Sequence, residues 1–182
     1  MPDVAISSAC FAPLVEAVGG NQQLGLQVID GTNMPEPYRA LLVNHGDMTT
    51  TLERFHGCRL HIAVLGRVQD GDIYSRQVIL LDEHENAVEY GAIRIHLAAL
   101  PLLARQEVLA GQRPLGGVLV NHGVPHTSHP SAFFALMPNA AILAALHLQQ
   151  PLTLYGRCNT LVHGDGQTIA EVVEILPPHP RS

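Results

Sequence analysis

The chain has 182 residues, of which 47% are hydrophobic and 14% are charged, and its formal net charge is −6. This composition is typical of a single folded domain (residues 1–182) with a real hydrophobic core, and it excludes an intrinsically disordered protein. The absence of a basic cluster argues against a nucleic-acid partner, and no apolar run reaches the ~20 residues that a membrane helix needs.

The cationic residues narrow the possible chemistry, because all of them are arginine and the chain contains no lysine. Schiff-base catalysis, pyridoxal phosphate attachment and a P-loop are therefore excluded, since each requires a lysine amine. Cys10, Cys58 and Cys158 are dispersed without a CxxC pair, and the N-terminal MPDVAISSAC lacks the basic region of a signal peptide. We therefore expect a cytoplasmic protein.

The first third of the chain predicts short helices joined by loops. Residues 1–34 are weakly patterned. The expected elements are a short helix in FAPLVEAV (11–18), loops at GGNQ (19–22) and DGTN (30–33), and a helix in PEPYRALLV (35–43). Asp47 is expected to cap a further helix that ends at Gly57 and that carries Met48, Leu52 and Phe55 on one face.

The remainder of the chain alternates apolar and polar residues in a way that predicts strands joined by hairpins. The predicted strands are RLHIAVLGRV (59–68), IYSRQVILL (73–81), ENAVEYGAIRIHL (85–97), SAFFALM (131–137), TLYGRCNTLVH (153–163) and TIAEVVEIL (168–176). The predicted helices are LPLLARQEVLAG (100–111), PLGGVLV (114–120) and NAAILAALHL (139–148). Two prolines and a glycine predict a loop over HGVPHTSHPS (122–131). Together these elements indicate an α+β fold around an antiparallel sheet.

Arg76 lies in a predicted strand among residues that belong to a core. Strand alternation places it on one face with Tyr74, Val78 and Leu80. A buried arginine is costly unless it has an anionic partner. That partner is either a carboxylate of the protein or a carboxylate of a ligand.

Glu174 presents the same conflict with the opposite charge, because it shares its face of the last strand with Val172 and Leu176. Burial among aliphatic side chains favours the protonated form, which suits a general acid. Alternatively, Glu174 pairs with Arg76 or Arg157 and has a structural role. The opposite face of this strand, which carries Glu171, is also apolar, so alternation alone does not choose between the two glutamates.

The histidines and the repeated pentapeptide LVNHG (42–46 and 119–123) raise the question of a metal site. His122, His126 and His129 are spaced four and three residues apart, but the prolines between and after them prevent a helix that would align them. No cysteine pair or carboxylate lies nearby at ligand spacing. We therefore expect no metal here, and we expect Cys158 to be a structural cysteine rather than an activated thiol.

Five segments together resemble the chorismate pyruvate-lyase family in order and approximate spacing. They are DMTTTLERFHG (47–57), YSRQVIL (74–80), RPLGGVL (113–119), YGRC (155–158) and EVVEILPP (171–178). The resemblance covers roughly residues 38–180 and leaves residues 1–35 outside. It implies an α+β fold with a six-stranded antiparallel sheet, helical flaps over a buried ligand pocket, and no metal or organic cofactor. The effector-binding (UTRA) domains of GntR-type repressors share this fold more distantly.

The resemblance also implies an activity, the elimination of pyruvate from chorismate to give 4-hydroxybenzoate, and it implies roles for particular residues. Arg76 matches the arginine that grips the ring carboxylate, and Glu174 matches the acidic residue opposite it, which we expect to act as the general acid. Met48 and Leu115 match residues whose backbone groups touch the ligand. Arg157 lies in the matching YGR segment, and its charge suggests that it helps to bind a second carboxylate.

Two alternatives stay open. The chain departs from the family at NHGVPHTSHP (121–130) and AALHLQQPLTLYGR (144–157), where the flap is built, so the enzyme could act on another aromatic or enolpyruvyl acid. The chain could instead be a non-catalytic binder of small carboxylates, like the UTRA domains. Those domains follow a DNA-binding module, and the 35 residues before the resemblance are too few and too acidic for one. In every case the expected partner is a small-molecule carboxylate.

Overall fold

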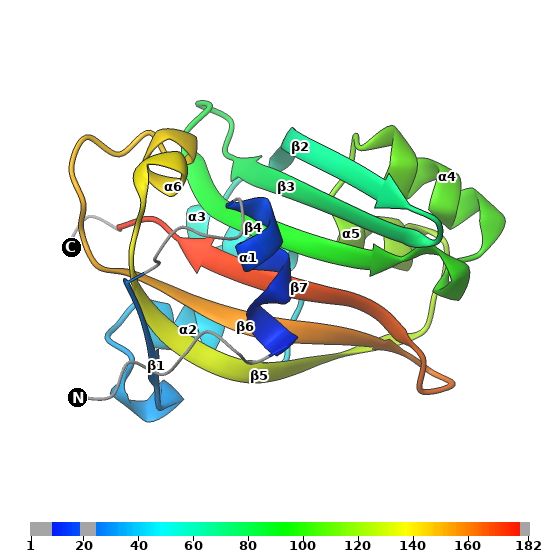
Figure 1. The fold of residues 1–182 in the computed structure, drawn as a ribbon, viewed down its shortest axis with the longest axis horizontal. Coiled ribbons are helices and arrows are strands. Elements are labelled where there is room, and N and C mark those ends of the chain that lie inside the picture. Colours follow the sequence, from blue (N-terminus) through cyan, green and yellow to red (C-terminus); the bar gives the residue numbers. More distant parts are fainter. Residues whose placement is uncertain (1–8, 19–24, 179–182) are drawn as a thin grey trace.

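The structure, a computed structural model, describes residues 9–18 and 25–178 and has the α+β architecture expected from the sequence. Seven strands form one antiparallel sheet in the order β1-β5-β6-β7-β4-β3-β2 (Figure 1). They are β1 (Gly25–Ile29), β2 (His61–Asp70), β3 (Ile73–Leu81), β4 (Ala87–His96), β5 (His126–Met137), β6 (Leu154–His163) and β7 (Thr168–Leu176). The sheet has one strand more than the six expected. The predicted GGNQ loop lies outside the described residues.

The additional strand is β1, which pairs only with the end of β5, from Phe133 to Met137. Its residues are exposed or half-buried throughout, because it lies at the edge of the sheet. An edge strand with no buried face lacks the alternation that marks a strand in a sequence, which explains why this segment was expected to be irregular.

The prediction of a loop over residues 122–131 is wrong for its second half, since β5 begins at His126. The register of β5 against β6 shifts between Pro130 and Ala132. Because β1 pairs only from Phe133 onward, this part of β5 has no strand on its outer side. A proline is tolerated at such an edge position, because the N–H that proline lacks is not needed to bond a neighbouring strand.

The helices are short and lie close to their predicted positions. They are α1 (Ala12–Ala17), α2 (Tyr38–Leu42), α3 (Met48–His56), α4 (Leu102–Ala110), α5 (Leu115–Asn121) and α6 (Ala140–Ala145), with 3-10 turns η1 (Ala9–Phe11), η2 (Gly31–Asn33) and η3 (Leu97–Ala99). The Asp47 side chain accepts from the Thr50 N–H and caps α3, as predicted. Gly57 ends α3 in the left-handed conformation. Phe55, expected on the buried face, is 46% exposed.

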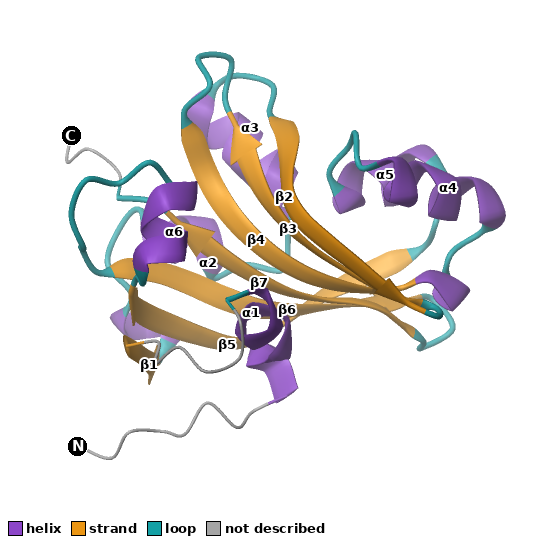
Figure 2. Ribbon diagram, turned by 45° about the horizontal axis from the view of Figure 1, so that its top comes forward, coloured by secondary structure: helices purple, strands orange, loops and turns teal. Residues whose placement is uncertain are grey.

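The sheet carries helices on both faces, and its strands alternate between the two. On one face, here called the α1 face, η1, α1 and α6 pack against residues such as Ile79, Tyr90 and Val173. On the other, the α3 face, α2 and α3 cover one end of the sheet, and α4 and α5 lie side by side at the other (Figure 2). The gap between these two helical groups leaves part of the α3 face uncovered. None of the helices in the described ranges is long and apolar enough to cross a bilayer.

Candidate functional site

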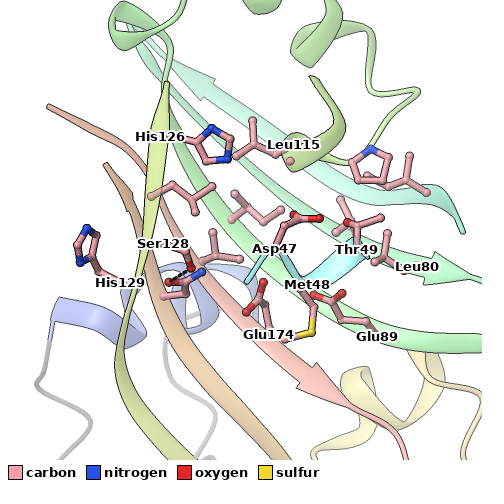
Figure 3. A pocket seen from close by; sticks show the side chains of 18 of the residues that line it. Asp47, Met48, Thr49, Leu80, Glu89, Leu115, His126, Ser128, His129 and Glu174 are labelled. Carbon is pink, nitrogen blue, oxygen red and sulfur yellow. Dashed lines mark hydrogen bonds between the residues drawn. The ribbon is translucent and has the colours of Figure 1, made fainter. Parts of the chain in front are cut away.

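A pocket of about 460 Å³ occupies this gap on the α3 face. Its floor comes from β3, β4 and β7, its roof from the first residues of α3 and α5, and one wall from β5 and β6 (Figure 3). The volume lies within the ~300–1,000 Å³ of small-molecule sites. The aliphatic lining residues are Ile62, Val78, Leu80, Ile93, Leu115, Leu161 and Val172.

Arg76 lines this pocket from β3 and is only 2% exposed. Its Nη1 and Nη2 groups donate long hydrogen bonds of 3.4 Å to the carbonyl oxygens of Val108 and Arg113, and its Nε has no partner. Within the part of the chain that the structure describes, no carboxylate lies within ion-pair distance of Arg76. Burial lowers the pKa of Arg76 from its ordinary value, but an arginine stays charged in proteins. The pocket therefore contains a buried cation without a counterion.

Arg157 is fully buried on β6, and its surroundings are the opposite of those of Arg76. Its Nε donates to a Glu174 carboxylate oxygen, and its Nη groups donate to the carbonyl oxygens of Leu42, Asn44 and Gly46 at 2.9–3.2 Å. Arg157 is not among the lining residues of the pocket. These contacts give it a structural role, in place of the predicted contact with a second ligand carboxylate.

Glu174 lines the pocket from β7 and forms an ion pair with Arg157. This is one of the two pairings that the sequence analysis gave as the alternative to a general acid. It does not pair with Arg76, because the two lie on strands separated by β4: Arg76 faces Ile93, and Glu174 faces Gly91. An ion pair with arginine requires the charged carboxylate. The carboxylate expected to act as the general acid is thus already in contact with a cation of the protein.

Glu89 was missed in the sequence. It lies on β4, lines the pocket, is 5% exposed, and its Oε2 has no hydrogen-bond partner. Burial raises its pKa well above the ordinary range, the charges of Glu174 and Asp47 raise it further, and Arg157 opposes the shift. The sequence did contain a signal for Glu89, because strand alternation places it on one face with Ile93 and Ile95. The same pattern singled out Arg76 and Glu174.

Met48 and Leu115, expected near a ligand, are the first residues of α3 and α5 and both line the pocket. The two helices meet at their N-terminal ends, where Asp47 Oδ1 lies against Gly116 so closely that a β-carbon would overlap it. The structure thus brings together Arg76, Met48, Leu115 and Glu174, four of the five residues predicted to form the site.

The wall from β5 and β6 is polar and contains much of the segment in which the sequence departs from the lyase family. Ser128 Oγ donates to Asn159 Oδ1 at 3.0 Å, and His129 Nε2 lies 2.8 Å from Thr127 Oγ1. His45 Nδ1 lies 3.3 Å from the carbonyl oxygen of Ser128. Specificity for a ligand would therefore come in part from residues 121–130.

The histidines do not converge on a metal site. His45 lies beside β5, whereas His122 contacts Glu107 of α4 at 2.6 Å. Among the residues described, no group of three His, Cys, Asp or Glu side chains is placed to hold a metal ion. Cys158 is buried, and burial raises the pKa of its thiol, which makes it a structural cysteine.

Comparison with known proteins identifies the fold. No family model and no curated protein matches the sequence. Among solved structures, the chain resembles PhnF from Mycobacterium smegmatis (TM-score 0.58, 13% identity, 74% of this chain and 64% of PhnF). It also resembles the effector domain of PhnF (TM-score 0.56, 12% identity, 74% of this chain and 90% of that domain). A third similar structure is the ligand-binding domain of a regulator assigned to the GntR family from Bordetella bronchiseptica (TM-score 0.53, 12% identity, 68% of this chain and 90% of that domain).

The chain has the fold of these regulatory effector domains. It spans 64% of the length of PhnF but 90% of the separate PhnF effector domain, so the shared part is the effector domain. At such low identity the likeness concerns the fold alone. It agrees with the α+β fold that the resemblance seen in the sequence implied.

Proposed function

We propose that this chain binds a small organic carboxylate in the pocket on the α3 face, with Arg76 as its anchor. The observation that carries the proposal is the buried Arg76 guanidinium, which lines the pocket and has no carboxylate partner among the described residues. A ligand carboxylate would supply both the missing charge and an acceptor for Nε. The relatives in fold are regulators whose corresponding domain binds an effector or ligand, which favours binding over catalysis.

The binding can be tested by calorimetry with benzoate, 4-hydroxybenzoate and chorismate, with neutral benzamide as the matched control. We expect at least one carboxylate to bind and benzamide not to bind. Arg76→Gln should weaken the binding about a hundredfold, equivalent to about 2.7 kcal/mol. Arg59→Gln removes the same charge from a side chain that is 94% exposed and should leave affinity unchanged. Equal binding of benzamide, or unchanged binding by Arg76→Gln, would contradict the proposal.

A chorismate lyase is the second candidate, because the four residues to which the resemblance assigns ligand contacts all line one pocket. In this case the proton donor would be Glu89 rather than Glu174, since Glu174 is held by Arg157. Incubation of the protein with chorismate, with 4-hydroxybenzoate and pyruvate measured together, distinguishes the two functions. Binding of chorismate without release of either product would exclude the lyase and leave the binding domain.

A further inference from the structure

The carboxylates of Glu89 and Glu174 lie together at one end of the pocket, and the Asp47 carboxylate, which caps α3, lies nearby. Figure 3 shows the side chains of Glu89 and Glu174 near the sulfur of Met48, with Asp47 close by. The charges of Glu174 and Asp47 both act on Glu89. Arg157 is the cation that acts on Glu89 from within the protein, and it is already committed to Glu174 and to three carbonyl oxygens. This end of the pocket is therefore negative.

Arg76 makes the other end positive, and the strand register gives the separation of the two main-chain positions. Arg76 on β3 lies opposite Ile93, whereas Glu89 lies opposite Leu80, four residues further along. At about 3.3 Å per residue, the two positions are about 13 Å apart along the strands. The aliphatic side chains of Val78, Leu80 and Ile93 line the floor between them.

Both ends contain a buried polar atom that the chain does not satisfy. Among the described residues, Arg76 Nε finds no acceptor and Glu89 Oε2 finds no donor. These residues are 2% and 5% exposed, so bulk water compensates neither of them well. The two orphan atoms face one pocket, have opposite character, and are separated by an apolar floor.

We infer that the ligand is zwitterionic, with a carboxylate that binds Arg76 and an ammonium group that binds Glu89, separated by an apolar body. This inference rests on the proposed function and deepens it. An ammonium group would donate to Glu89 Oε2 and offset the negative charges of Glu174 and Asp47, whereas a plain carboxylic acid would leave the negative end unmatched.

Two isosteric probes test the inference by calorimetry: 4-(aminomethyl)benzoate, which is a zwitterion, and 4-(hydroxymethyl)benzoate, which is not. We expect the zwitterion to bind at least about tenfold more tightly. Glu89→Gln should abolish this preference. Glu171→Gln removes a carboxylate from the opposite face of β7, where it contacts His96, and should preserve the preference.

A second measurement does not depend on any variant. If Glu89 holds a proton in the empty pocket, the arriving ammonium displaces it. Binding of 4-(aminomethyl)benzoate should then release up to about one proton at pH values below the raised pKa of Glu89, seen as a heat that varies with the ionisation enthalpy of the buffer. The hydroxymethyl analogue should release none. The other ionisable groups that act on Glu89 are Asp47, Arg157 and Glu174.

The outcomes separate the two proposals. Equal or tighter binding of the hydroxymethyl compound, or a preference that survives Glu89→Gln, would overturn the zwitterion and leave carboxylate binding at Arg76 intact. If neither compound binds, or if Arg76→Gln binds both as the wild type does, the proposed function fails and the zwitterion fails with it.

Discussion

Arg76 and Arg157 are both buried, but only Arg157 has its charge balanced by the described part of the chain. Arg157 is held by Glu174 and by three main-chain carbonyl oxygens, while Arg76 has two long hydrogen bonds and an unpaired Nε. The same residue type therefore serves the fold at one position and, in the proposed function, a ligand at the other. The two should respond differently to substitution.

We predict that Arg157→Met lowers the free energy of unfolding by about 3–5 kcal/mol, because it leaves the buried Glu174 carboxylate unpaired. In the ligand-free protein, Arg76→Met should leave the free energy of unfolding unchanged or raise it, since it removes a buried charge without a counterion. Urea unfolding of both variants measures the difference. A cost for Arg76→Met as large as that for Arg157→Met would show that the folded chain already compensates Arg76.

At the scale of elements, the contact between α3 and α5 forms the roof of the pocket. Asp47 caps α3 through Oδ2, and its Oδ1 lies against Gly116 in the first turn of α5. Gly116 is therefore required for space, whereas a β-carbon at the neighbouring Gly117 would meet nothing within 4 Å.

This difference gives a matched pair of variants. Gly116→Ala should lower the free energy of unfolding by about 1–3 kcal/mol through overlap with Asp47, and it should weaken carboxylate binding because the roof shifts. Gly117→Ala should be neutral or stabilising by up to about 1 kcal/mol, since alanine favours a helix. Thermal unfolding and benzoate titration of both variants test this, and equal behaviour of the two would exclude a steric role for Gly116.

At the scale of the whole molecule, Glu89 links stability to pH. Burial and neighbouring carboxylates raise its pKa in the folded protein. Its carboxyl group therefore binds more protons folded than unfolded between the unfolded value of about 4.3 and the raised value. The stability contributed by the protonated group is complete below about pH 4.3 and is lost as the pH rises through the folded pKa.

We accordingly expect the free energy of unfolding of the ligand-free protein to fall as the pH rises from about 4.3 towards the raised pKa of Glu89, by at most about 1.4 kcal/mol per pH unit. Glu89→Gln should remove this component. Glu36→Gln changes a glutamate whose side chain is 54% exposed and should retain it. Urea unfolding across the pH range provides the measurement, and an identical slope in wild type and Glu89→Gln would contradict the assignment.

Much of this molecule could be predicted from its sequence wherever one face of an element is buried. The bounds of β3 and β7 match the prediction, because regular alternation marked Arg76 and Glu174 as inward-facing. The missed features depend on neighbours far away in the chain. β1 is specified by pairing with β5 and not by its own pattern, and Pro130 is tolerated because β5 has no outer neighbour there.

In the candidate site, too, the features set by local pattern could be predicted, and those that depend on distant neighbours could not. The sequence placed Met48 and Leu115 beside Arg76 through the family resemblance, and the structure brings them into one pocket. The partner of Glu174 could not be chosen from the sequence, because alternation tells which way a side chain points and not what faces it. Glu89 was overlooked, although alternation along its strand also places it on a face with apolar residues.

The contacts of Arg157 also explain what the first LVNHG pentapeptide does. Its Leu42, Asn44 and Gly46 contribute carbonyl oxygens to the guanidinium, so this contact ties the main chain before α3 to the sheet. The identities of these side chains are largely irrelevant to that contact. The second copy of the pentapeptide, at the end of α5, makes a different contact, since its His122 lies 2.6 Å from Glu107.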